Sequence, residues 1–539
     1  MSFQPAGLDT RAYRGEWVIT SMLADRAERF ADEIAVESKT GAVSYAELVE
    51  RAASVARYLR DLGVEPGDRV ATMLLSDLNY LAAWHGILWC GAVDVPINVE
   101  YKGMFLEFLL KDSQVEVLVI DARWLPRLTE IDVPALRHII VAGSSELDSP
   151  GSRLVVHSLA DALSGPGVAR TPRGELDPTY VIYTSGTTGS PKGAMHNNRS
   201  SVHYLMPFLE CLGIRNDDVC YSMFPLYHQT GRSACTSTSL WAGNRLVLRD
   251  RFSTSEFWRD IATTGSTWTG YHGAALLFLW HQEPSDRDRE HRLRFAVGAS
   301  APKEIFEAWE DRFGVRLYEV FGMTELGVGT GLTDGPRKVG TLGRACRQIE
   351  LEIHDEAGDE LPAFEVGEAV WRPRYPDAIF QGYWNNAEAT IEAWRDLWFH
   401  SGDAGYLDDD GFFVLSDRIK DSIRRRGENI SSRLVEEAVR RVLDVAECAA
   451  YPAFVEIGGS EQEVMIALVW PGEEPLDVAD AFRRLCDAMP RHAVPRYLRI
   501  VDQLPYTATQ RARKFILRDE GVTADSHDRV ALGIEPGRG

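Results

Sequence analysis

The most informative stretch of the sequence is a strand-like segment followed directly by glycines, hydroxyl residues and a lysine. It reads Thr179-Tyr180-Val181-Ile182-Tyr183-Thr184-Ser185-Gly186-Thr187-Thr188-Gly189-Ser190-Pro191-Lys192-Gly193. The glycines let backbone N–H groups turn toward an anion, the hydroxyls add donors, and Lys192 adds a mobile positive charge. We therefore predict a strand that runs into a polyphosphate-binding loop, with a helix after it.

A surface turn rich in glycine and threonine is the simpler alternative for this run. A Walker A loop is excluded, because that motif needs Gly-Lys followed by serine or threonine, whereas here Lys192 is followed by Gly193. The order of all the residues, rather than their composition, favours the phosphate site over the turn.

Short apolar runs alternate with helix-like segments on the N-terminal side of this loop. Ser44 and Glu47 have capping-box spacing ahead of an apolar-periodic helix that reaches Leu62 and stops at Gly63. A second helix is predicted at Tyr80–Trp89, and strands are predicted at Arg69–Leu75, Val93–Ile97, Glu116–Asp121, Leu136–Val141 and Thr179–Thr184. This alternation predicts an α/β fold with parallel-rich sheets covered by helices.

The pattern changes near Asp417, where we place a domain boundary. The strand-like run Phe412–Leu415 leads into Asp417-Arg418-Ile419-Lys420-Asp421 and a triple arginine, Arg424-Arg425-Arg426. Beyond it, segments 432–442 and 478–488 are helical and segment 463–470 is strand-like. We predict a large N-terminal domain over residues 1–418 and a small α+β domain over residues 419–539.

The composition agrees with at least two globular domains, because 539 residues exceed what one core holds. A formal net charge of −22 argues against nucleic acid or an anionic membrane as the main partner. The seven cysteines are scattered without a Cys-x-x-Cys pair, which predicts buried free thiols in a reducing compartment. With no signal-peptide pattern and no uncharged run of membrane-spanning length, we expect a cytoplasmic protein. Its oligomeric state stays open, with a homodimer as one alternative.

The phosphate-loop run resembles that of the adenylate-forming superfamily, which includes acyl-CoA synthetases, adenylation domains of peptide synthetases and luciferases. Further segments resemble the family's motifs in the family's order, over essentially the whole chain. They are Phe224-Pro225-Leu226-Tyr227-His228, Gly298-Ala299-Ser300-Ala301-Pro302, Tyr318-Glu319-Val320-Phe321-Gly322-Met323-Thr324-Glu325, Ser401-Gly402-Asp403-Ala404-Gly405 and Asp417–Arg433. Among relatives, the chain most resembles acyl-CoA synthetases of the crotonobetaine/carnitine and fatty-acid type.

The resemblance implies a nucleotide role for residues of each motif. It assigns Thr184, Ser185, Gly186, Thr187, Thr188, Gly189 and Lys192 to the phosphates, and Gly298, Ala299, Ser300, Phe321, Gly322 and Met323 to the adenine side. Phe321 offers a flat apolar face to a purine, Thr324 a hydroxyl to the α-phosphate, and Glu325 an oxygen ligand to Mg²⁺. Taken singly, Glu325 would be a solvated charge.

Asp403 and Arg418 are assigned to the ribose and phosphates by the same resemblance. Asp403 follows Ser-Gly in what we predict to be a turn, where an ordinary turn-forming aspartate is the alternative. For Arg418 the alternative is a surface ion pair. Lys420, two residues later, is implied to be the hinge about which the small domain turns.

Three residues are predicted to line the acyl pocket. His228 ends an apolar-aromatic stretch, where a lone histidine is more often a packed core residue than a catalyst. Tyr271 and His272 precede an apolar helix and are assigned to the same pocket on weaker grounds.

The triple arginine Arg424-Arg425-Arg426 suits phosphate groups of an acceptor, with a solvated basic turn as the alternative.

Near its C-terminus the chain departs from the family pattern. Relatives carry a Pro-x-Thr-x-x-Gly-Lys-type segment whose lysine bridges the substrate carboxylate and the α-phosphate, whereas Arg511 stands in the lysine's place here. Arginine keeps the charge but presents a broad planar fork. Lys514 is the rival candidate, although in an extended segment it would point to the opposite face from Arg511.

The resemblance implies an enzyme that uses ATP and Mg²⁺ to convert a small-molecule carboxylic acid to an acyl-adenylate, with release of pyrophosphate. Coenzyme A is the leading acceptor for the acyl group. Two alternatives stay open: an adenylating enzyme with another acceptor, such as an amine or nitrite, and a weakened homologue that only binds a nucleotide or acyl ligand.

Overall fold

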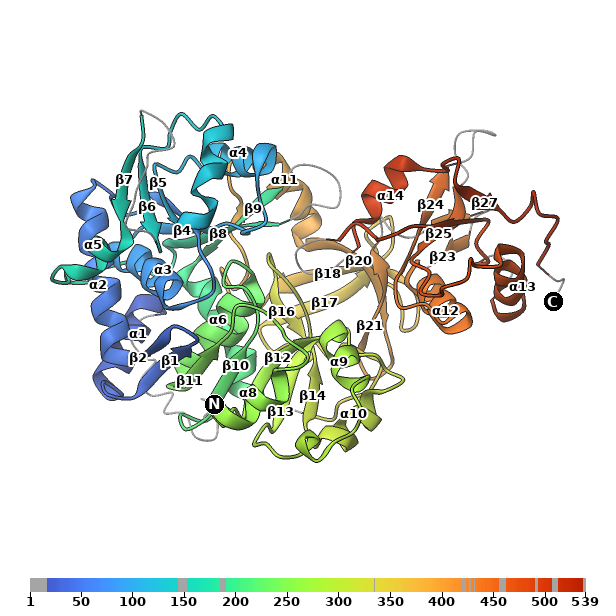
Figure 1. The fold of residues 1–539 in the computed structure, drawn as a ribbon, viewed down its shortest axis with the longest axis horizontal. Coiled ribbons are helices and arrows are strands. Elements are labelled where there is room, and N and C mark those ends of the chain that lie inside the picture. The colour runs from blue at the N-terminus through green and yellow to red at the C-terminus, as the bar shows by residue number, and fades with distance from the viewer. Residues whose placement is uncertain are drawn as a thin grey trace.

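The computed structural model describes residues 17–143, 153–184, 191–333, 335–418, 423–425, 428–430, 432–454, 462–489, 493–506 and 512–536. Most of the chain forms a large lobe, and the C-terminal elements form a small lobe beside it (Figure 1). The sheets of the large lobe carry most of the predicted site residues.

An eight-stranded sheet carries the phosphate-loop segment. Its order is β19 (Gly382–Tyr383), β9 (Lys192–Asn197), β8 (Pro178–Thr184), β4 (Val93–Pro96), β3 (Arg69–Met73), β5 (Val117–Asp121), β6 (His138–Ala142) and β7 (Val155–Ser158). Neighbouring strands are parallel except for the pairs β8–β9 and β9–β19. The strands predicted on the N-terminal side of the loop therefore all belong to one sheet.

A second sheet has seven strands. Its order is β14 (Arg316–Glu319), β13 (Phe295–Ala299), β12 (Trp268–His272), β10 (Val219–Ser222), β11 (Arg245–Leu248), β1 (Ile34–Ser38) and β2 (Gly41–Ser44). Only the β1–β2 pair is antiparallel. Both sheets are thus parallel-rich, as their apolar runs predict, because helices must cover both faces of a parallel sheet.

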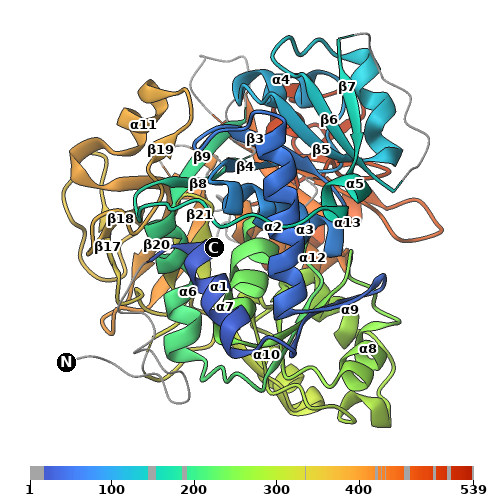
Figure 2. The ribbon, with the colours of Figure 1, turned by 90° about the vertical axis from the view of Figure 1, so that its left-hand side faces the viewer.

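Helices pack between the two large sheets and over their outer faces. They are α1 (Ile19–Arg29), α2 (Tyr45–Asp61), α3 (Leu78–Cys90), α4 (Gly103–Asp112), α5 (Leu159–Ser164), α6 (Asn198–Cys211), α7 (Thr238–Ala242), α8 (Phe257–Thr264), α9 (Gly273–Trp280) and α10 (Phe306–Phe313), with the 3₁₀ helix η2 (Ala122–Glu130) and the π-helix η3 (Thr230–Ser237). Figure 2 shows α2 and α3 side by side, and one apolar core joins them to strands of both sheets.

The start of α2 confirms the predicted capping box. The Ser44 hydroxyl accepts the backbone N–H of Glu47 at 3.2 Å, and the Glu47 carboxylate accepts that of Ser44 at 2.8 Å. Gly63, with φ of 87°, follows the last turn in a conformation that suits glycine. Local signals therefore fix both ends of this helix.

A third, antiparallel sheet completes the large lobe: β17 (Ile349–His354), β18 (Gly367–Pro373), β20 (Phe399–Leu407) and β21 (Phe413–Arg418). Beside it lie the hairpin β15 (Phe321–Met323) and β16 (Gly327–Thr330), the helix α11 (Ala387–Ala393) and the short 3₁₀ helix η5 (Arg395–Leu397). Another short 3₁₀ helix, η4 (Asp286–Asp288), lies near α8 and α10. The predicted α/β class is confirmed for the large lobe.

The small lobe has its own apolar core and an α+β composition. It contains α12 (Ser432–Leu443), α13 (Val478–Ala488), α14 (Lys514–Glu520), the pair β22 (Ile423–Arg425) and β23 (Glu428–Ile430), and a sheet of β24 (Cys448–Phe454), β25 (Gln462–Leu468), β26 (Tyr497–Ile500) and β27 (Ser526–Asp528). The boundary between residues 418 and 419 stays a prediction, because residues 419–422 lie outside the described residues.

All seven cysteines are free thiols, and five of them are buried, as their spacing predicts. Over the described ranges, no helix is both long enough and apolar enough to cross a bilayer. Strands β8, β9 and β15, which carry predicted site residues, meet β19 at one place in the large lobe.

Candidate active site

The predicted phosphate loop connects the adjacent ends of β8 and β9. Thr184 ends β8 opposite Lys192, the first residue of β9. Ser185, Gly186, Thr187, Thr188 and Gly189 lie outside the described residues, so their predicted contacts stay predictions. The expected helix directly after the loop is wrong, because Lys192–Asn197 form a strand and α6 begins only at Asn198, where Asn197 caps it.

Glu325 lies beside this loop, in the turn between β15 and β16. Its side chain is buried, and its Oε1 accepts a hydrogen bond from the Tyr383 hydroxyl at 2.9 Å and one from the Thr184 hydroxyl at 3.4 Å. The Lys192 ammonium lies 5.1 Å from the centroid of the Tyr383 ring. The fold thus brings Glu325 to Thr184 and Lys192, which lie far earlier in the sequence, around one tyrosine.

Tyr383 was missed by the sequence analysis. It lies on β19, opposite Ala194 of β9, and burial raises its pKa, with a further rise from the neighbouring Glu325 carboxylate. The phenol therefore stays protonated near neutral pH and donates to the carboxylate. Only the pairing of β19 with β9 brings it here, and nothing in the local sequence around Tyr383 indicates that pairing.

The oxygen atoms at this place suit a hard divalent cation that is also held by phosphates. Mg²⁺ takes oxygen ligands and commonly binds through one or two carboxylates plus phosphate oxygens. Glu325 supplies one fixed carboxylate, and among the described residues no group of three or more acidic, histidine or cysteine side chains forms a closed cage. Glu325 therefore fits a shared magnesium site and not an all-protein one.

Phe321 is held with one face of its ring covered. It stacks on Trp371 with centroids 5.2 Å apart and planes 7° apart, and the Phe413 ring meets it edge-on at 5.5 Å. Phe321, Gly322 and Met323 form β15, where any side chain at Gly322 would collide with the backbone oxygen of Gly327. The aromatic packing fixes the ring plane and therefore the direction in which its other face points.

A second segment with predicted nucleotide contacts ends β13. Gly298 and Ala299 belong to the strand, and a side chain at Gly298 would collide with the backbone oxygen of Tyr271. Ser300 follows with φ of 65°, a conformation uncommon for serine. Glu319 anchors the next residue, because its Oε1 accepts the backbone N–H of Ala301 at 3.0 Å.

Glu319 is a buried carboxyl group that the sequence analysis did not single out. It also accepts a hydrogen bond from the Tyr271 hydroxyl, at 3.3 Å. Burial raises the pKa of Glu319 to about 7, against the opposing effect of its hydrogen bonds. This group therefore titrates close to neutral pH, next to the segment predicted to contact adenine.

Asp403 lies in β20, and the predicted turn at this place is wrong. Gly402 has φ of 71° and donates its N–H to the Glu368 carboxylate at 3.1 Å, and the β18–β20 register is irregular between Glu368 and Val370. The Ser-Gly pair therefore distorts a strand instead of reversing the chain. Asp403 is buried and lies opposite Arg418 of β21. The two predicted ribose residues are therefore neighbours across a pair of antiparallel strands.

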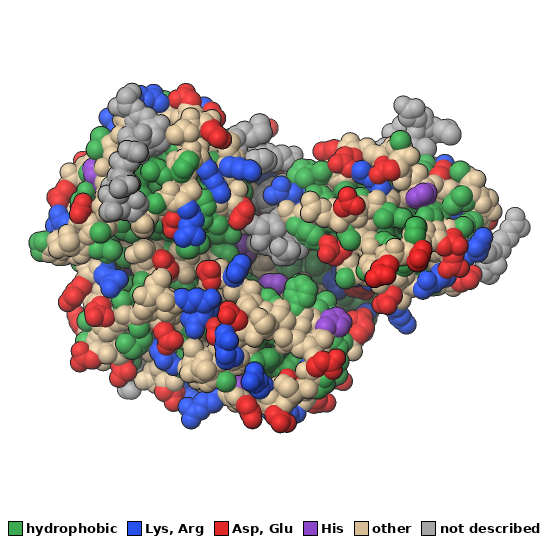
Figure 3. Space-filling model, viewed as in Figure 1, with side chains coloured by type: hydrophobic (Ala, Val, Ile, Leu, Met, Phe, Trp, Pro, Cys, Tyr) green, Lys and Arg blue, Asp and Glu red, His purple; other side chains and the backbone are tan. Residues whose placement is uncertain are grey.

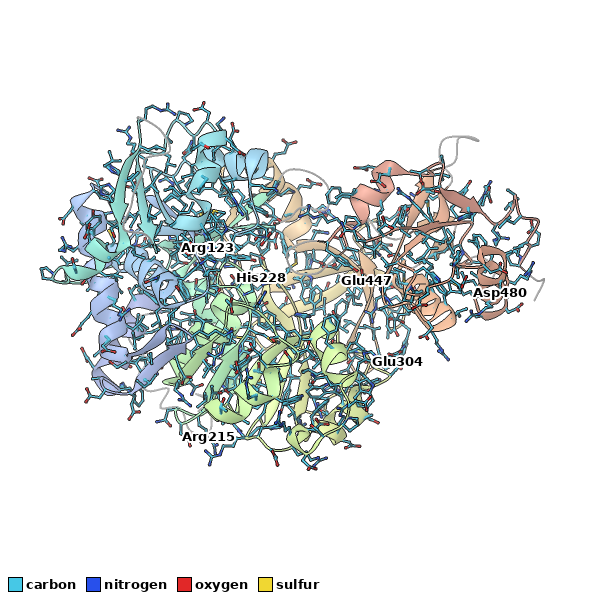
Figure 4. All side chains as sticks on the ribbon, viewed as in Figure 1. Arg123, Arg215, His228, Glu304, Glu447 and Asp480 are labelled. Carbon is cyan, nitrogen blue, oxygen red and sulfur yellow. The ribbon has the colours of Figure 1, made fainter. Side chains whose placement is uncertain are left out.

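The residues predicted for the acyl pocket lie on the strand β12, which carries Tyr271 and His272, and in the loop between β10 and η3, which carries His228. His228, labelled in Figure 4 where the large lobe faces the small one, accepts the N–H of Thr230 through Nδ1 at 3.3 Å. His272 accepts the N–H of Ala275 through Nδ1 at 3.4 Å, and burial lowers its pKa. Tyr271 is buried and its hydroxyl is bonded to Glu319, so it supports the segment after β13.

Three C-terminal predictions fall partly or wholly beyond what the structure describes. Arg511 and Lys420 lie outside the described residues, and Arg418 is described only for its backbone. Lys514 is described, and its Nζ lies 2.8 Å from Glu436 Oε1 in the small lobe. Burial raises the pKa of Tyr101, and the nearby charge of Arg513 opposes that rise, so the segment that follows Arg511 lies close to the large lobe.

Comparison with known proteins identifies the family. The family model for AMP-binding enzymes matches residues 23–384. The chain belongs to the AMP-binding enzyme family. The model for the C-terminal domain of AMP-binding enzymes matches residues 434–511, so both lobes have counterparts in this family.

One related sequence and two similar structures each cover 90% or more of the chain. The crotonobetaine/carnitine–CoA ligase of Salmonella paratyphi A is 31% identical over 508 residues, covering 90% of this chain and 96% of that protein. The structure of ATP-bound MatB from Rhodopseudomonas palustris has a TM-score of 0.81 at 25% identity, covering 93% of this chain and 98% of its own. The anthranilate CoA ligase AuaEII, in complex with anthranoyl-AMP, has a TM-score of 0.84 at 22% identity, covering 98% and 100%, and shows a shared fold.

Proposed function

We propose that this chain uses ATP to convert a carboxylic acid to an acyl-adenylate, releases pyrophosphate, and then passes the acyl group to coenzyme A. The observation that supports this most is the meeting of Thr184, Lys192 and Glu325 where β8 and β9 end. A hydroxyl and an ammonium at the two ends of a glycine-rich loop suit the phosphates of ATP, and a carboxylate beside them suits a divalent cation bound to those phosphates. The ligase relatives support the same reaction class.

The residues around the loop would align the reacting groups. Lys192 and the loop hold the β- and γ-phosphates, and the Thr324 hydroxyl donates to the α-phosphate that the carboxylate attacks. Figure 3 shows Lys and Arg side chains on the large lobe beside the junction of the lobes, although the chain as a whole carries −22. Alignment of nucleophile and phosphate, with fixed donors at the developing charge, accounts for most of such a rate enhancement.

Glu325 would hold Mg²⁺ together with phosphate oxygens of ATP. When bound, Mg²⁺ would neutralise phosphate charge and orient the phosphates for in-line attack. The part played by this chain is to fix the carboxylate, which the Tyr383 and Thr184 hydroxyls do through Oε1.

The nucleoside would lie between the two adenine-side segments. Phe321 would stack on the purine with the face opposite Trp371, and Gly298, Ala299 and Ser300 would flank it. Asp403 would accept hydrogen bonds from the ribose hydroxyls, with Arg418 beside it. His228, Tyr271 and His272 would form or support the acyl side, where two Nδ1 acceptors bonded to backbone N–H groups leave the proton of each neutral imidazole on Nε2.

The small lobe would supply the last cation and the change of conformation. We propose that Arg511 bridges the carboxylate and the α-phosphate, and that residues 419–539 rotate about Lys420 between the two half-reactions. Two features support Arg511 over Lys514. Lys514 is held by Glu436 within the small lobe, and Arg513, two residues after Arg511, lies near Tyr101 of the large lobe.

An acid panel tests the proposal. Purified protein is mixed with Mg²⁺, ATP and one carboxylic acid at a time, chosen to span betaine-type, aryl, short-chain, long-chain and dicarboxylic acids, and pyrophosphate is measured. We expect release with one class of acid and not with ATP alone. Binding of ATP without acid-dependent release for any member would favour the weakened homologue, and release without thiol-dependent product would favour another acceptor, such as an amine or nitrite.

A further inference from the structure

His196 is a buried histidine that connects the strand of Lys192 to the turn of Thr324. It lies on β9 four residues after Lys192, on the same face of the strand by the alternation of side chains. Its side chain has no exposed surface. Its Nε2 lies 2.8 Å from the backbone oxygen of Thr324, and its Nδ1 lies 3.1 Å from the Ser200 hydroxyl.

The partners of the ring decide which nitrogen carries the proton. A carbonyl oxygen only accepts, so Nε2 must be the protonated nitrogen and donates to Thr324. Burial lowers the pKa of His196 to about 4, so at neutral pH the ring is uncharged and Nδ1 is an acceptor for Ser200. With both nitrogens bonded, the ring has a single orientation.

One face of the His196 ring is in contact with residues that lie next to the predicted acyl-pocket residue His228. The His196 ring stacks on Tyr180 of β8 with centroids 4.9 Å apart, and the Tyr180 hydroxyl accepts a hydrogen bond from Gln229 Nε2 at 2.8 Å. Gln229 directly follows His228, and Tyr180 and Gln229 are both buried. A continuous set of buried contacts therefore runs from Thr324 through His196 to the segment that ends in His228.

The turn of Thr324 and Glu325 depends on such contacts because its hairpin is small. Strands β15 and β16 form a two-stranded sheet of their own. Three contacts tie Glu325 to the side of the eight-stranded sheet: the backbone N–H of Phe380 donates to its backbone oxygen at 2.9 Å, and the Tyr383 and Thr184 hydroxyls donate to its Oε1. Thr324 itself is held by the His196 bond to its backbone oxygen. Losing the His196 bond would let Thr324 shift relative to Lys192.

We infer that His196 is a positioning residue for the adenylation step: its Nε2–H holds the Thr324 backbone, and therefore the Thr324 hydroxyl, in register with Lys192. The inference rests on the proposed function. Displacing a reacting or stabilising group by about 1 Å can lower the rate about 100-fold. An effect on this scale distinguishes positioning from simple packing.

A matched pair of substitutions tests the hydrogen bond itself. In His196→Gln, the side-chain amide reaches the position of Nε2 and can donate to Thr324, whereas in His196→Asn it reaches only the position of Nδ1. Both replacements are uncharged, polar and similar in size. Adenylation is measured as pyrophosphate release with the acid that the panel identifies, over a range of ATP concentrations, and folding is measured by thermal unfolding.

We expect His196→Asn to lower kcat for adenylation by about 100-fold, with a much smaller change in KM for ATP, and His196→Gln to restore kcat to within about tenfold of the original. His354→Asn, the same substitution at a buried histidine of β17 outside the site, is the control and should stay near the original kcat. Near-normal kcat for His196→Asn, or an equal loss for the two variants with unchanged unfolding, would overturn the inference.

A spectroscopic measurement covers the case in which His196→Asn does not fold. Histidine ¹⁵N labelling of the unsubstituted protein, with the signal assigned through His196→Gln, should show at pH 7 a neutral ring whose proton is on Nε2 and exchanges slowly. A proton on Nδ1 would overturn the inference. If the unsubstituted protein released no pyrophosphate with any acid, the proposed function would fail, which is a different result from an active enzyme whose two variants behave alike.

Discussion

Replacing Tyr383 by phenylalanine should weaken the proposed magnesium site without removing it. The change deletes the hydroxyl that donates to Glu325 Oε1 at 2.9 Å. It keeps the ring over which the Lys192 ammonium lies at 5.1 Å. The Thr184 hydroxyl, at 3.4 Å from the same oxygen, would remain as a donor to that atom.

The size of the effect follows from the kind of bond that is lost. A hydrogen bond to a charged group contributes roughly 1.5–3 kcal/mol when it is buried. Tyr383 is only partly buried, so the lower end applies, which corresponds to about a tenfold change. Loss of groups that orient a metal-binding carboxylate typically costs about 10–100-fold in metal affinity or activity.

Two measurements check this prediction. Adenylation at low Mg²⁺ should fall about tenfold in Tyr383→Phe and recover in part as Mg²⁺ is raised. Binding of Mn²⁺ in the presence of ATP, followed by electron paramagnetic resonance without any acid, should weaken by a similar factor. Tyr375→Phe, which removes the hydroxyl of an exposed tyrosine outside the site, is the control. Unchanged Mn²⁺ binding and an unchanged Mg²⁺ requirement in Tyr383→Phe would refute the reasoning.

Three further predictions follow from the site and the small lobe. Glu319→Gln should remove a loss of stability that occurs as the pH rises. The folded-state pKa of about 7 is above the unfolded value, so the protonated Glu319 stabilises the fold most at acid pH, and this contribution declines between about pH 4.5 and 7 by at most roughly 1.4 kcal/mol per pH unit. The melting temperatures of the variant and the parent, compared over this pH range, measure the difference. Arg511→Ala should lower pyrophosphate release at least about 100-fold. Lys514→Ala should leave the release nearly intact and instead lower the melting temperature of the small lobe, because Lys514 pairs with Glu436. The reverse pattern would move the bridging role to Lys514. Lys420→Pro should slow thioester formation more than adenylation in single-turnover assays, because it restricts φ at the proposed hinge, and an equal fall in both would remove the support for that hinge.

Much of the fold could be predicted because its signals are local. The capping box of Ser44 and Glu47, the apolar runs of β3, β5 and β8, and the break at Gly63 each depend on residues close in sequence. The strand β9 was mistaken for a helix. A glycine-rich loop often precedes a helix. Here the residues from Lys192 to Asn197 instead form a strand that pairs antiparallel with β8, and the helix begins only after the cap residue Asn197.

The site could be predicted in its motifs but not in the contacts that hold them. The hydroxyl of Tyr383 reaches Glu325 over a separation of 58 residues, and His196 reaches the Thr324 backbone over 128. Each contact depends on how the β15–β16 hairpin packs against β9 and β19 of the eight-stranded sheet, and a single sequence carries no local signal for that packing. The pKa of Glu319 likewise depends on burial that only the packed structure creates.

The measurement that tests the central claim most directly is a balance of products with the acid that the panel identifies. Protein, Mg²⁺, ATP, that acid and coenzyme A are incubated together, and nucleotides and acyl products are quantified by mass spectrometry. The proposed reaction predicts AMP, pyrophosphate and the acyl-CoA thioester in equal amounts, with acyl-adenylate bound to the protein when coenzyme A is left out. Formation of ADP and phosphate, or accumulation of AMP with no thioester and no bound acyl-adenylate, would contradict it.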